Sequence, residues 1–258
     1  MIVIKSEAEI EKMRAACRAA AEILQAVAAL VQPGRTTGEL NEAAGDLIAQ
    51  HGGKSPFLGY KGYPGHVCVS VNEEVVHGIP GKRRVQYGDI VSLDVGIILD
   101  GFVGDNATTV AAGVVAPRTQ ELLRVTEQAL YAGIAAARAG NRVGDISHAV
   151  QSMVEAKGFS VVREFVGHGV GRKMHEDPQI PNFGKSGDGP KLKPGMTLAI
   201  EPMINAGTSD VQMLSDGWTV VAADGAPSAH FEHTVLVTEG EAEILTWLKK
   251  SQSQLKAR

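Results

Sequence analysis

Four carboxylates and one imidazole stand at positions from which they could build a single reactive site. They are Asp94, Asp105, His168, Glu201 and Glu232. Four carboxylates brought together without a counterion would repel one another, and most of them would take up a proton. Two divalent cations would balance the four negative charges, and a neutral imidazole would add a nitrogen ligand. The set therefore predicts a hydrolytic centre in which two metal ions activate a bridging water.

Three of these acids belong to apolar runs that are typical of buried strands. Asp94 follows the run 90–93, Glu201 follows the run 198–200, and Glu232 begins the run 232–237. A single acid is expected at the surface, because unpaired acids stay in water. An acid inside a buried run needs a partner or a metal ion. The shared context therefore favours the metal site over five unrelated surface groups.

The elements that must position these side chains follow from periodicity and capping signals. Ser6 and Glu9 have the spacing of a capping box, and the apolar positions that follow predict a helix ending near Val31. A second helix is predicted from Thr37 to His51. Strands are predicted over residues 67–72, 90–99 and 102–112, with a hairpin turn at residues 100–101, where Asp-Gly favours such a turn.

The second half of the chain repeats the pattern of the first. Seven positions match at an offset of 106: Gly34, Gly38, Leu40, Ala43, Leu47, Ile48 and Gly52 correspond to Gly140, Gly144, Ile146, Ala149, Met153, Val154 and Gly158. Gly88 and Asp94 correspond to Gly195 and Glu201 at an offset of 107. We interpret this as a duplicated unit with pseudo-twofold symmetry, because a solenoid would need at least three copies.

Helices and strands occur in blocks, which favours an α+β fold over a parallel, doubly wound sheet. We expect residues 1–250 to form one catalytic domain of two similar halves, at about 5–112 and 117–245. Residues 251–258 form a predicted polar tail. Since each half can bury a sheet face against its own two helices, the reactive residues are expected where the halves meet.

Composition excludes several functional classes. The chain has 258 residues, 44% hydrophobic and 21% charged, as in an ordinary soluble globule. Its net charge of −4 gives no basic surface for nucleic acid. No signal peptide or membrane-length apolar run is visible, so we expect a cytoplasmic protein without membrane contact. Cys17 is predicted to be a buried helical thiol, and no disulfide with Cys68 is expected.

A family resemblance is carried by motifs spread along the chain. They are Val71-Asn72-Glu73, His77-Gly78-Ile79-Pro80, Gly88-Asp89-Ile90-Val91, Asp94-Val95-Gly96, Gly101-Phe102, Gly104-Asp105, Gly167-His168-Gly169-Val170-Gly171, His175-Glu176-Asp177-Pro178, Leu192-Lys193-Pro194-Gly195-Met196, Ile200-Glu201-Pro202 and Glu232-His233-Thr234. Together they resemble the motifs of methionine aminopeptidases, from about residue 5 to 246. The resemblance implies the pita-bread fold, a duplicated α+β unit, in agreement with the internal repeat.

The resemblance favours the bacterial type I group. Only 32 residues separate His168 from Glu201, which leaves no room for the helical insert of type II members. We also expect the catalytic unit to begin directly at the start of the chain, as the resemblance to this group implies. The resemblance implies that Asp94 chelates one metal, that Asp105 and Glu232 bridge both, and that His168 and Glu201 complete the other. An oxygen-rich set with one imidazole and no thiolate suits Co, Mn, Fe or Zn in a catalytic site.

The same resemblance assigns roles to further residues. It makes Glu201 a proton shuttle, His175 a donor to the oxyanion of the tetrahedral intermediate, and His77 a contact to the scissile amide nitrogen. It lines the methionine pocket with Tyr60, Tyr63, Cys68, Met174 and Trp218, whose soft groups suit a thioether. Two positions depart from the family pattern, because many relatives have histidine at Lys61 and phenylalanine at Met174. His66, His230 and His233 are expected to be structural.

Asn72 and Ser228 match positions that hold a monovalent cation in relatives, although ordinary turn hydrogen bonds would explain them equally well. The implied function is removal of the initiator methionine from nascent proteins when the second residue is small. We expect a monomer that works in transient proximity to ribosomes. The alternatives are another pita-bread hydrolase, such as an X-Pro aminopeptidase or dipeptidase, and a pita-bread binding protein that has lost catalysis. The complete ligand set disfavours the latter.

Overall fold

The computed structural model describes residues 1–248, and the predicted polar tail at residues 251–258 lies outside this range. The helices are α1 (Glu7–Ala28), α2 (Thr37–Gln50), α3 (Pro117–Ala136) and α4 (Val143–Glu155), with a short 3-10 helix η1 (Tyr60–Gly62). The strands are β1 (Cys68–Val71), β2 (Glu74–Val76), β3 (Ile90–Leu99), β4 (Phe102–Ala111), β5 (Ser160–Val161), β6 (Gly167–Gly169), β7 (Glu176–Ile180), β8 (Thr197–Ile200), β9 (Met203–Asn205), β10 (Val211–Met213), β11 (Val220–Ala222), β12 (Ser228–His230), β13 (Glu232–Leu236) and β14 (Glu243–Ile244).

The predicted start of α1 is confirmed by its capping contacts. The backbone N–H of Ser6 donates to Glu9 Oε2 at 3.0 Å. This bond satisfies a group that has no partner within the helix. The helix ends at Ala28, three residues before the predicted Val31. Cys17 is fully buried on α1, both cysteines are free as predicted, and burial raises the pKa of the Cys17 thiol to about 12.

The predicted hairpin is also confirmed. The strands β3 and β4 pair antiparallel along their whole length, from Ile90 opposite Ala111 to Leu99 opposite Phe102. Asp100 and Gly101 make the turn with φ values of 49° and 77°. Positive φ at both central residues matches the twist of the flanking strands, which is why Asp-Gly is favoured there.

One large sheet contains strands from both halves of the chain. Its strand order is β1-β3-β4-β13-β8-β6-β7, with β14 added beside β13, and every pairing is antiparallel. The junction is the pairing of β4 with β13, where Glu232 lies opposite Ala107. Two smaller sheets, β10-β11-β2 and β12-β9-β5, flank it.

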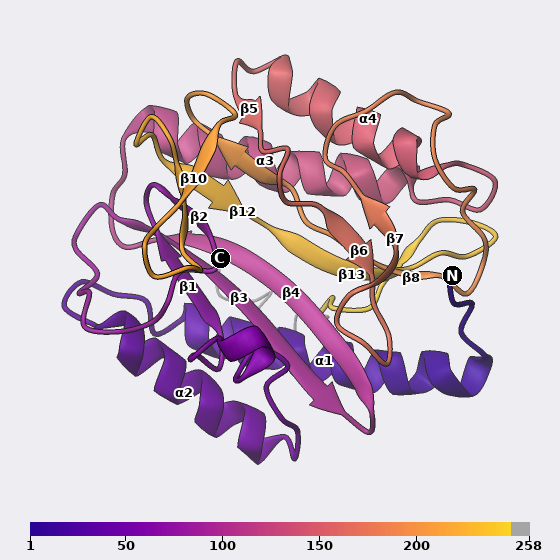
Figure 1. Ribbon diagram of the computed structural model, residues 1–258, viewed down its shortest axis with the longest axis horizontal. Coiled ribbons are helices and arrows are strands. Elements are labelled where there is room, and N and C mark those ends of the chain that lie inside the picture. The colour runs from indigo at the N-terminus through magenta and orange to yellow at the C-terminus, as the bar shows by residue number, and fades with distance from the viewer. Residues whose placement is uncertain (249–258) are drawn as a thin grey trace, which may run out of the picture.

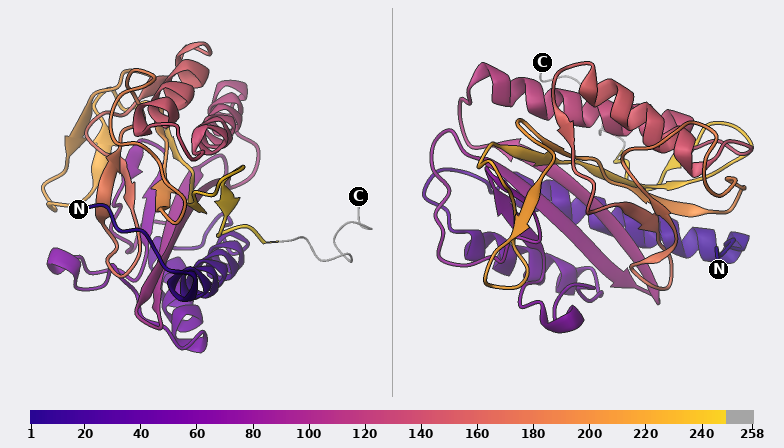
Figure 2. Two further views of the ribbon diagram at one scale, coloured as in Figure 1. Left: turned by 90° about the vertical axis from the view of Figure 1, so that its right-hand side faces the viewer. Right: turned by 45° about the horizontal axis from the view of Figure 1, so that its top comes forward.

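The helices form two pairs, with α3 and α4 at the top of Figure 1 and α1 and α2 at the bottom. The views in Figure 2 keep this separation, with strands between the pairs. One core cluster packs α1 and α2 against β1 and β3, through residues such as Ile23, Leu40 and Leu93. A second packs α3 and α4 against β8 and β13, through residues such as Leu130 and Val150. None of the helices within residues 1–248 is both long enough and apolar enough to cross a membrane.

Candidate active site

Strand register places the five predicted ligands on one face of the large sheet. Residues directly opposite in a pair share a face, and so do residues two apart along a strand. Ala107 lies opposite both Asp94 and Glu232, and Asp105 is two residues from it. Thr234, two residues after Glu232, lies opposite Ala199, which also lies opposite His168. Glu201 follows two residues after Ala199, just beyond the end of β8.

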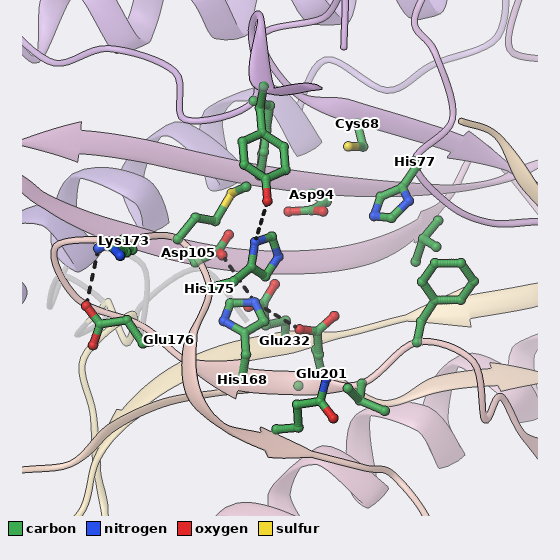
Figure 3. Close-up of a pocket in the computed structure, with 18 of the residues that line it drawn as sticks. Cys68, His77, Asp94, Asp105, His168, Lys173, His175, Glu176, Glu201 and Glu232 are labelled. Carbon is green, nitrogen blue, oxygen red and sulfur yellow. Dashed lines mark hydrogen bonds and ion pairs between the residues drawn. The ribbon is translucent and has the colours of Figure 1, made fainter. Parts of the chain in front are cut away.

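The ligand atoms come close together on this face, as Figure 3 shows. Atoms of Asp105, His168 and Glu232 all lie within 4.8 Å of one another. His168 Nε2 is 3.3 Å from Glu201 Oε1 and 4.0 Å from Asp105 Oδ2. The group is a buried Asp/His/Glu cluster of a kind that can hold a metal ion.

His168 has the tautomer that a metal ligand needs. Its Nδ1 lies 2.9 Å from the carbonyl oxygen of Gly169. A carbonyl only accepts, so Nδ1 carries the proton and Nε2 presents its lone pair to the cluster. Burial lowers the pKa of His168 to about 4, so the ring is neutral at physiological pH. A neutral imidazole is the form that binds metals.

Three of the four carboxylates of the cluster have an oxygen atom that the described residues leave without a hydrogen-bond partner. Among the described residues, Asp94 Oδ1, Asp105 Oδ1 and Glu232 Oε1 are buried without any hydrogen-bond partner. Burial raises the pKa of Asp94, Glu201 and Glu232 well above the usual range, with mutual repulsion adding to it, and raises that of Asp105 to about 7. Unpaired buried acids are costly unless a cation balances them. The residues present therefore fit divalent cations.

A cavity of about 870 Å³ opens above the cluster. All twelve predicted ligand, catalytic and pocket residues line it: Tyr60, Tyr63, Cys68, His77, Asp94, Asp105, His168, Met174, His175, Glu201, Trp218 and Glu232. Tyr63 and Trp218 meet edge to face, with ring centroids 5.1 Å apart. Cys68 lies opposite Asp94 in the β1–β3 pair, which puts its thiol on the face of the cluster. Lys61 is exposed at the rim, with a left-handed φ of 47° and its ammonium 5.4 Å from the Tyr60 ring.

His77 and His175 approach the cluster from different segments. His77 follows β2 with a φ of 59°, and burial lowers its pKa to about 4. The His175 ring centroid is 4.4 Å from that of His168. The hydroxyl of Tyr60 lies 3.4 Å from His175 Nδ1. Burial lowers the pKa of His175, and the nearby Lys61 ammonium lowers it further. Both rings are therefore neutral groups able to donate one hydrogen bond.

Sequence reasoning missed His230, which it classed as structural. His230 lines the cavity and is 2% exposed, with Nε2 3.6 Å from Glu201 Oε2 and no hydrogen-bond partner for that atom among the described residues. Glu201 thus lies between two imidazoles. His230 is two residues before Glu232, and residues two apart in an extended segment share a face, so this spacing was the signal that could have identified it.

Asn72 and Ser228 lie outside the cavity lining but next to each other. The backbone N–H of Ser228 donates to the carbonyl oxygen of Asn72 at 2.9 Å. The Asn72 side chain donates to Asp89 Oδ1 at 2.9 Å and accepts from the backbone N–H of Ile90 at 3.0 Å. These bonds hold the turn between β1 and β2, and they bring together the two positions expected near a monovalent cation.

Comparison with known proteins gives the same answer over the length of the chain. The model of metallopeptidase family M24 matches residues 11–239. A methionine aminopeptidase of Clostridium perfringens is 50% identical over 249 residues, which cover 96% of this chain and 100% of that protein. Methionine aminopeptidase 1 of Bacillus subtilis is 50% identical over 246 residues, covering 95% and 99%.

Structural similarity agrees with these sequence matches. The crystal structure of methionine aminopeptidase from Thermotoga maritima superposes with a TM-score of 0.95 at 49% identity, covering 96% of this chain and 100% of that one. The expected pita-bread α+β fold is confirmed. The chain therefore belongs to metallopeptidase family M24 and, within it, to the bacterial type I methionine aminopeptidases.

Proposed function

We propose that this protein removes the initiator methionine from nascent proteins whose second residue is small, by metal-assisted hydrolysis of the first peptide bond. One observation carries the proposal: a buried cluster of carboxylates, three of which have an oxygen without a hydrogen-bond partner within residues 1–248, faces a cavity lined by aromatic and sulfur-containing side chains. Thioether and thiol groups pack favourably against aromatic rings, so this lining suits a methionine side chain. Length and identity match methionine aminopeptidases throughout.

The five-residue cluster would hold two divalent ions, for which Co, Mn, Fe and Zn are all suitable. Asp94, Asp105, His168, Glu201 and Glu232 would be the residues that hold these ions. The partnerless oxygens of three of these acids support the assignment. Bound ions would polarise the substrate carbonyl and make a water acidic enough to lose a proton near neutral pH.

The protein side chains would then orient the peptide and move protons. His175 would donate to the oxygen of the scissile carbonyl, where negative charge develops. His77 would contact the scissile amide nitrogen. Glu201, whose pKa is raised by burial, would hold the proton taken from water and pass it to the leaving amine. Tyr60, Tyr63, Cys68, Met174 and Trp218 would enclose the methionine side chain.

The decisive experiment combines metal removal with a peptide panel. Activity on Met-Ala-Ser should disappear on chelation and return with added Mn²⁺ or Co²⁺, whereas Met-Lys and Met-Leu peptides should stay uncut. His168→Ala should lower activity at least ~10²-fold because it removes a metal ligand. Metal-independent turnover would refute the metal centre. Preferential cleavage of X-Pro peptides would instead identify an X-Pro aminopeptidase.

We further propose that residues 1–250 act as one catalytic domain of two halves, at about 5–112 and 117–245. The pairing of β4 with β13 across the halves supports this.

Since the substrate is made on ribosomes, we place the protein in the cytoplasm near them, as a monomer without nucleic-acid contact of its own. The net charge of −4 supports the last point. A monovalent cation near Asn72 and Ser228 would brace the β1–β2 turn. Light scattering would test the mass, and thermal unfolding with and without K⁺ would test the cation, because an ion that binds the folded protein raises its Tm.

A further inference from the structure

A buried ion pair joins the segment before α1 to the loop that carries His175. Lys5 Nζ donates to Glu176 Oε2 at 2.6 Å, and the two side chains are only 3% and 9% exposed. Lysine and glutamate are rarely buried to this degree unless they are paired. Such a pair loses most of its Coulomb energy to desolvation, so its net contribution to stability is small. The main effect of the pair is therefore to fix the position of the segment that carries Glu176 relative to the segment that carries Lys5.

Both ends of the pair are tied to other backbone segments. The backbone N–H of Lys5 donates to the carbonyl oxygen of Gly195 at 2.9 Å. The second oxygen of Glu176, Oε1, accepts from the backbone N–H of Lys173 at 3.2 Å. Glu176 therefore closes the short loop between β6 and β7 on itself, while Lys5 holds that carboxylate from outside the loop.

The packing around the pair leaves the loop little freedom. A Cβ atom added to Gly171 would lie 2.6 Å from Glu176 Oε1 and 2.7 Å from Lys5 Cε, closer than real Cβ contacts. The carbonyl oxygen of Gly171 accepts from the backbone N–H of Val103 at 2.8 Å, which fixes the start of the loop to β4. Thus residues 171–176 are clamped at both ends.

The clamped loop presents His175 to the cavity. His175 makes one polar side-chain contact among the described residues, the 3.4 Å approach to Tyr60. The ring also packs against His168, with centroids 4.4 Å apart, but neither contact fixes the backbone of residue 175, which the neighbouring Glu176 helps to hold. Figure 3 shows Glu176 to one side of the four carboxylates of the cluster, and its charge still reaches His168, where it opposes the lowering of the His168 pKa by burial.

We propose that Lys5 is a positioning residue for His175, acting through its buried ion pair with Glu176. The proposal rests on the transition-state role assigned to His175 above. Lys5→Met should lower kcat by about 10- to 100-fold, because small displacements of a positioned group are costly in rate. KM should change by less than about twofold, since the contact is made chiefly in the transition state.

A double-mutant cycle separates positioning from general damage. In a His175→Ala background, Lys5→Met should lower kcat no further, because the group it positions is gone. Metal content should stay the same in all variants. Arg14→Met is the matched control. It breaks the ion pair between Arg14 on α1 and Glu243, whose charged atoms are 2.7 Å apart. Neither residue lines the cavity, so kcat should be unchanged.

The outcomes are distinguishable. A kcat loss of equal size in both backgrounds, or an unchanged kcat in Lys5→Met, would overturn the proposal. A normal rate in His175→Ala alone would instead refute the assigned role of His175, and with it the basis of the proposal. Should Lys5→Met fail to fold by circular dichroism, Glu176→Gln keeps the side-chain volume and removes the charge. The same cycle with that variant should show a smaller kcat loss that again vanishes in the His175→Ala background.

Discussion

The histidines around the cavity differ in the groups that their imidazole rings contact, and these contacts predict their roles. His168 has its Nδ1 proton fixed by the Gly169 carbonyl and Nε2 turned toward Glu201 and Asp105. His77 contacts aromatic rings, with centroids 5.4 Å from Phe165 and 6.0 Å from Trp218. His175 stands beside His168 without joining the cluster of carboxylates. One imidazole is therefore suited to metal binding and two to substrate contact.

This difference gives a prediction at the scale of single residues. Alanine at His77 or His175 should leave metal stoichiometry and folding close to normal, because neither belongs to the ligand cluster. The turnover number on Met-Ala-Ser should fall ~10²–10³-fold, the usual cost of removing one transition-state donor. Metal analysis beside steady-state kinetics measures both effects. His148→Ala on the exposed side of α4 is the control and should change neither. Loss of metal would reassign the histidine as a ligand.

At the scale of elements, the site depends on how closely α1 approaches β4. Asp105 faces the cavity, so the preceding Gly104 faces the opposite side of the sheet, where α1 lies. A Cβ atom at Gly104 would lie 2.3 Å from the carbonyl oxygen of Ala16 and 2.7 Å from the backbone nitrogen of Cys17. The helix backbone thus rests directly on the strand, and only glycine permits this contact.

Gly104→Ala should therefore destabilise the protein, because the obstructing atoms belong to the helix backbone and cannot rotate away. Overpacking of this kind costs about 1–3 kcal/mol, and the shift of β4 should also weaken metal binding through Asp105. Gly81→Ala is the matched control, since a Cβ there meets nothing within 4 Å and its φ is not positive. Urea denaturation of both variants measures the difference. Equal midpoints for the two would contradict the proposed packing constraint.

At the scale of the whole molecule, protons and metal ions compete for the same buried acids. Burial raises the pKa of Asp105 from its ordinary value near ~4 to about 7. Below that pH the folded, metal-free protein holds a proton on Asp105, and a metal ion must displace it. Above that pH this carboxylate is already ionised. His168, with its pKa lowered to about 4, is neutral throughout and adds no opposing effect above pH 5.

Metal affinity should therefore rise as the pH increases toward 7. Above pH 7 it should rise less steeply, because Asp105 no longer has a proton for the metal to displace. The slope should be about tenfold per pH unit for each proton displaced, since one pKa unit corresponds to ~1.4 kcal/mol. Titration calorimetry with Mn²⁺ at pH 5.5, 6.5 and 7.5, in buffers of different ionisation enthalpy, gives both affinity and proton release. Affinity that does not change across this range would show that the carboxylates are ionised before the metal binds. His168→Ala protein serves as the control with a weakened site.

Local patterns in the sequence predicted the elements that carry the reactive residues. The capping signal of α1, the apolar run of β3 and the Asp-Gly hairpin turn act over a few neighbouring residues, so they can be recognised without the fold. The resemblance carried by the motifs identified the family. In the second half, strands of two or three residues such as β5, β6 and β14 gave no comparable signal, because pairing with distant strands is what stabilises them.

Only the tertiary structure decided which side chains meet across long separations in the chain. It placed His230 against Glu201 and Lys5 against Glu176, contacts that no local pattern encodes. It also put all five predicted ligands on one sheet face, through the register of β3, β4, β13, β8 and β6. The physical reason is that residue type and spacing set the chemistry available, whereas packing and register over the whole sheet set the distances at which that chemistry operates.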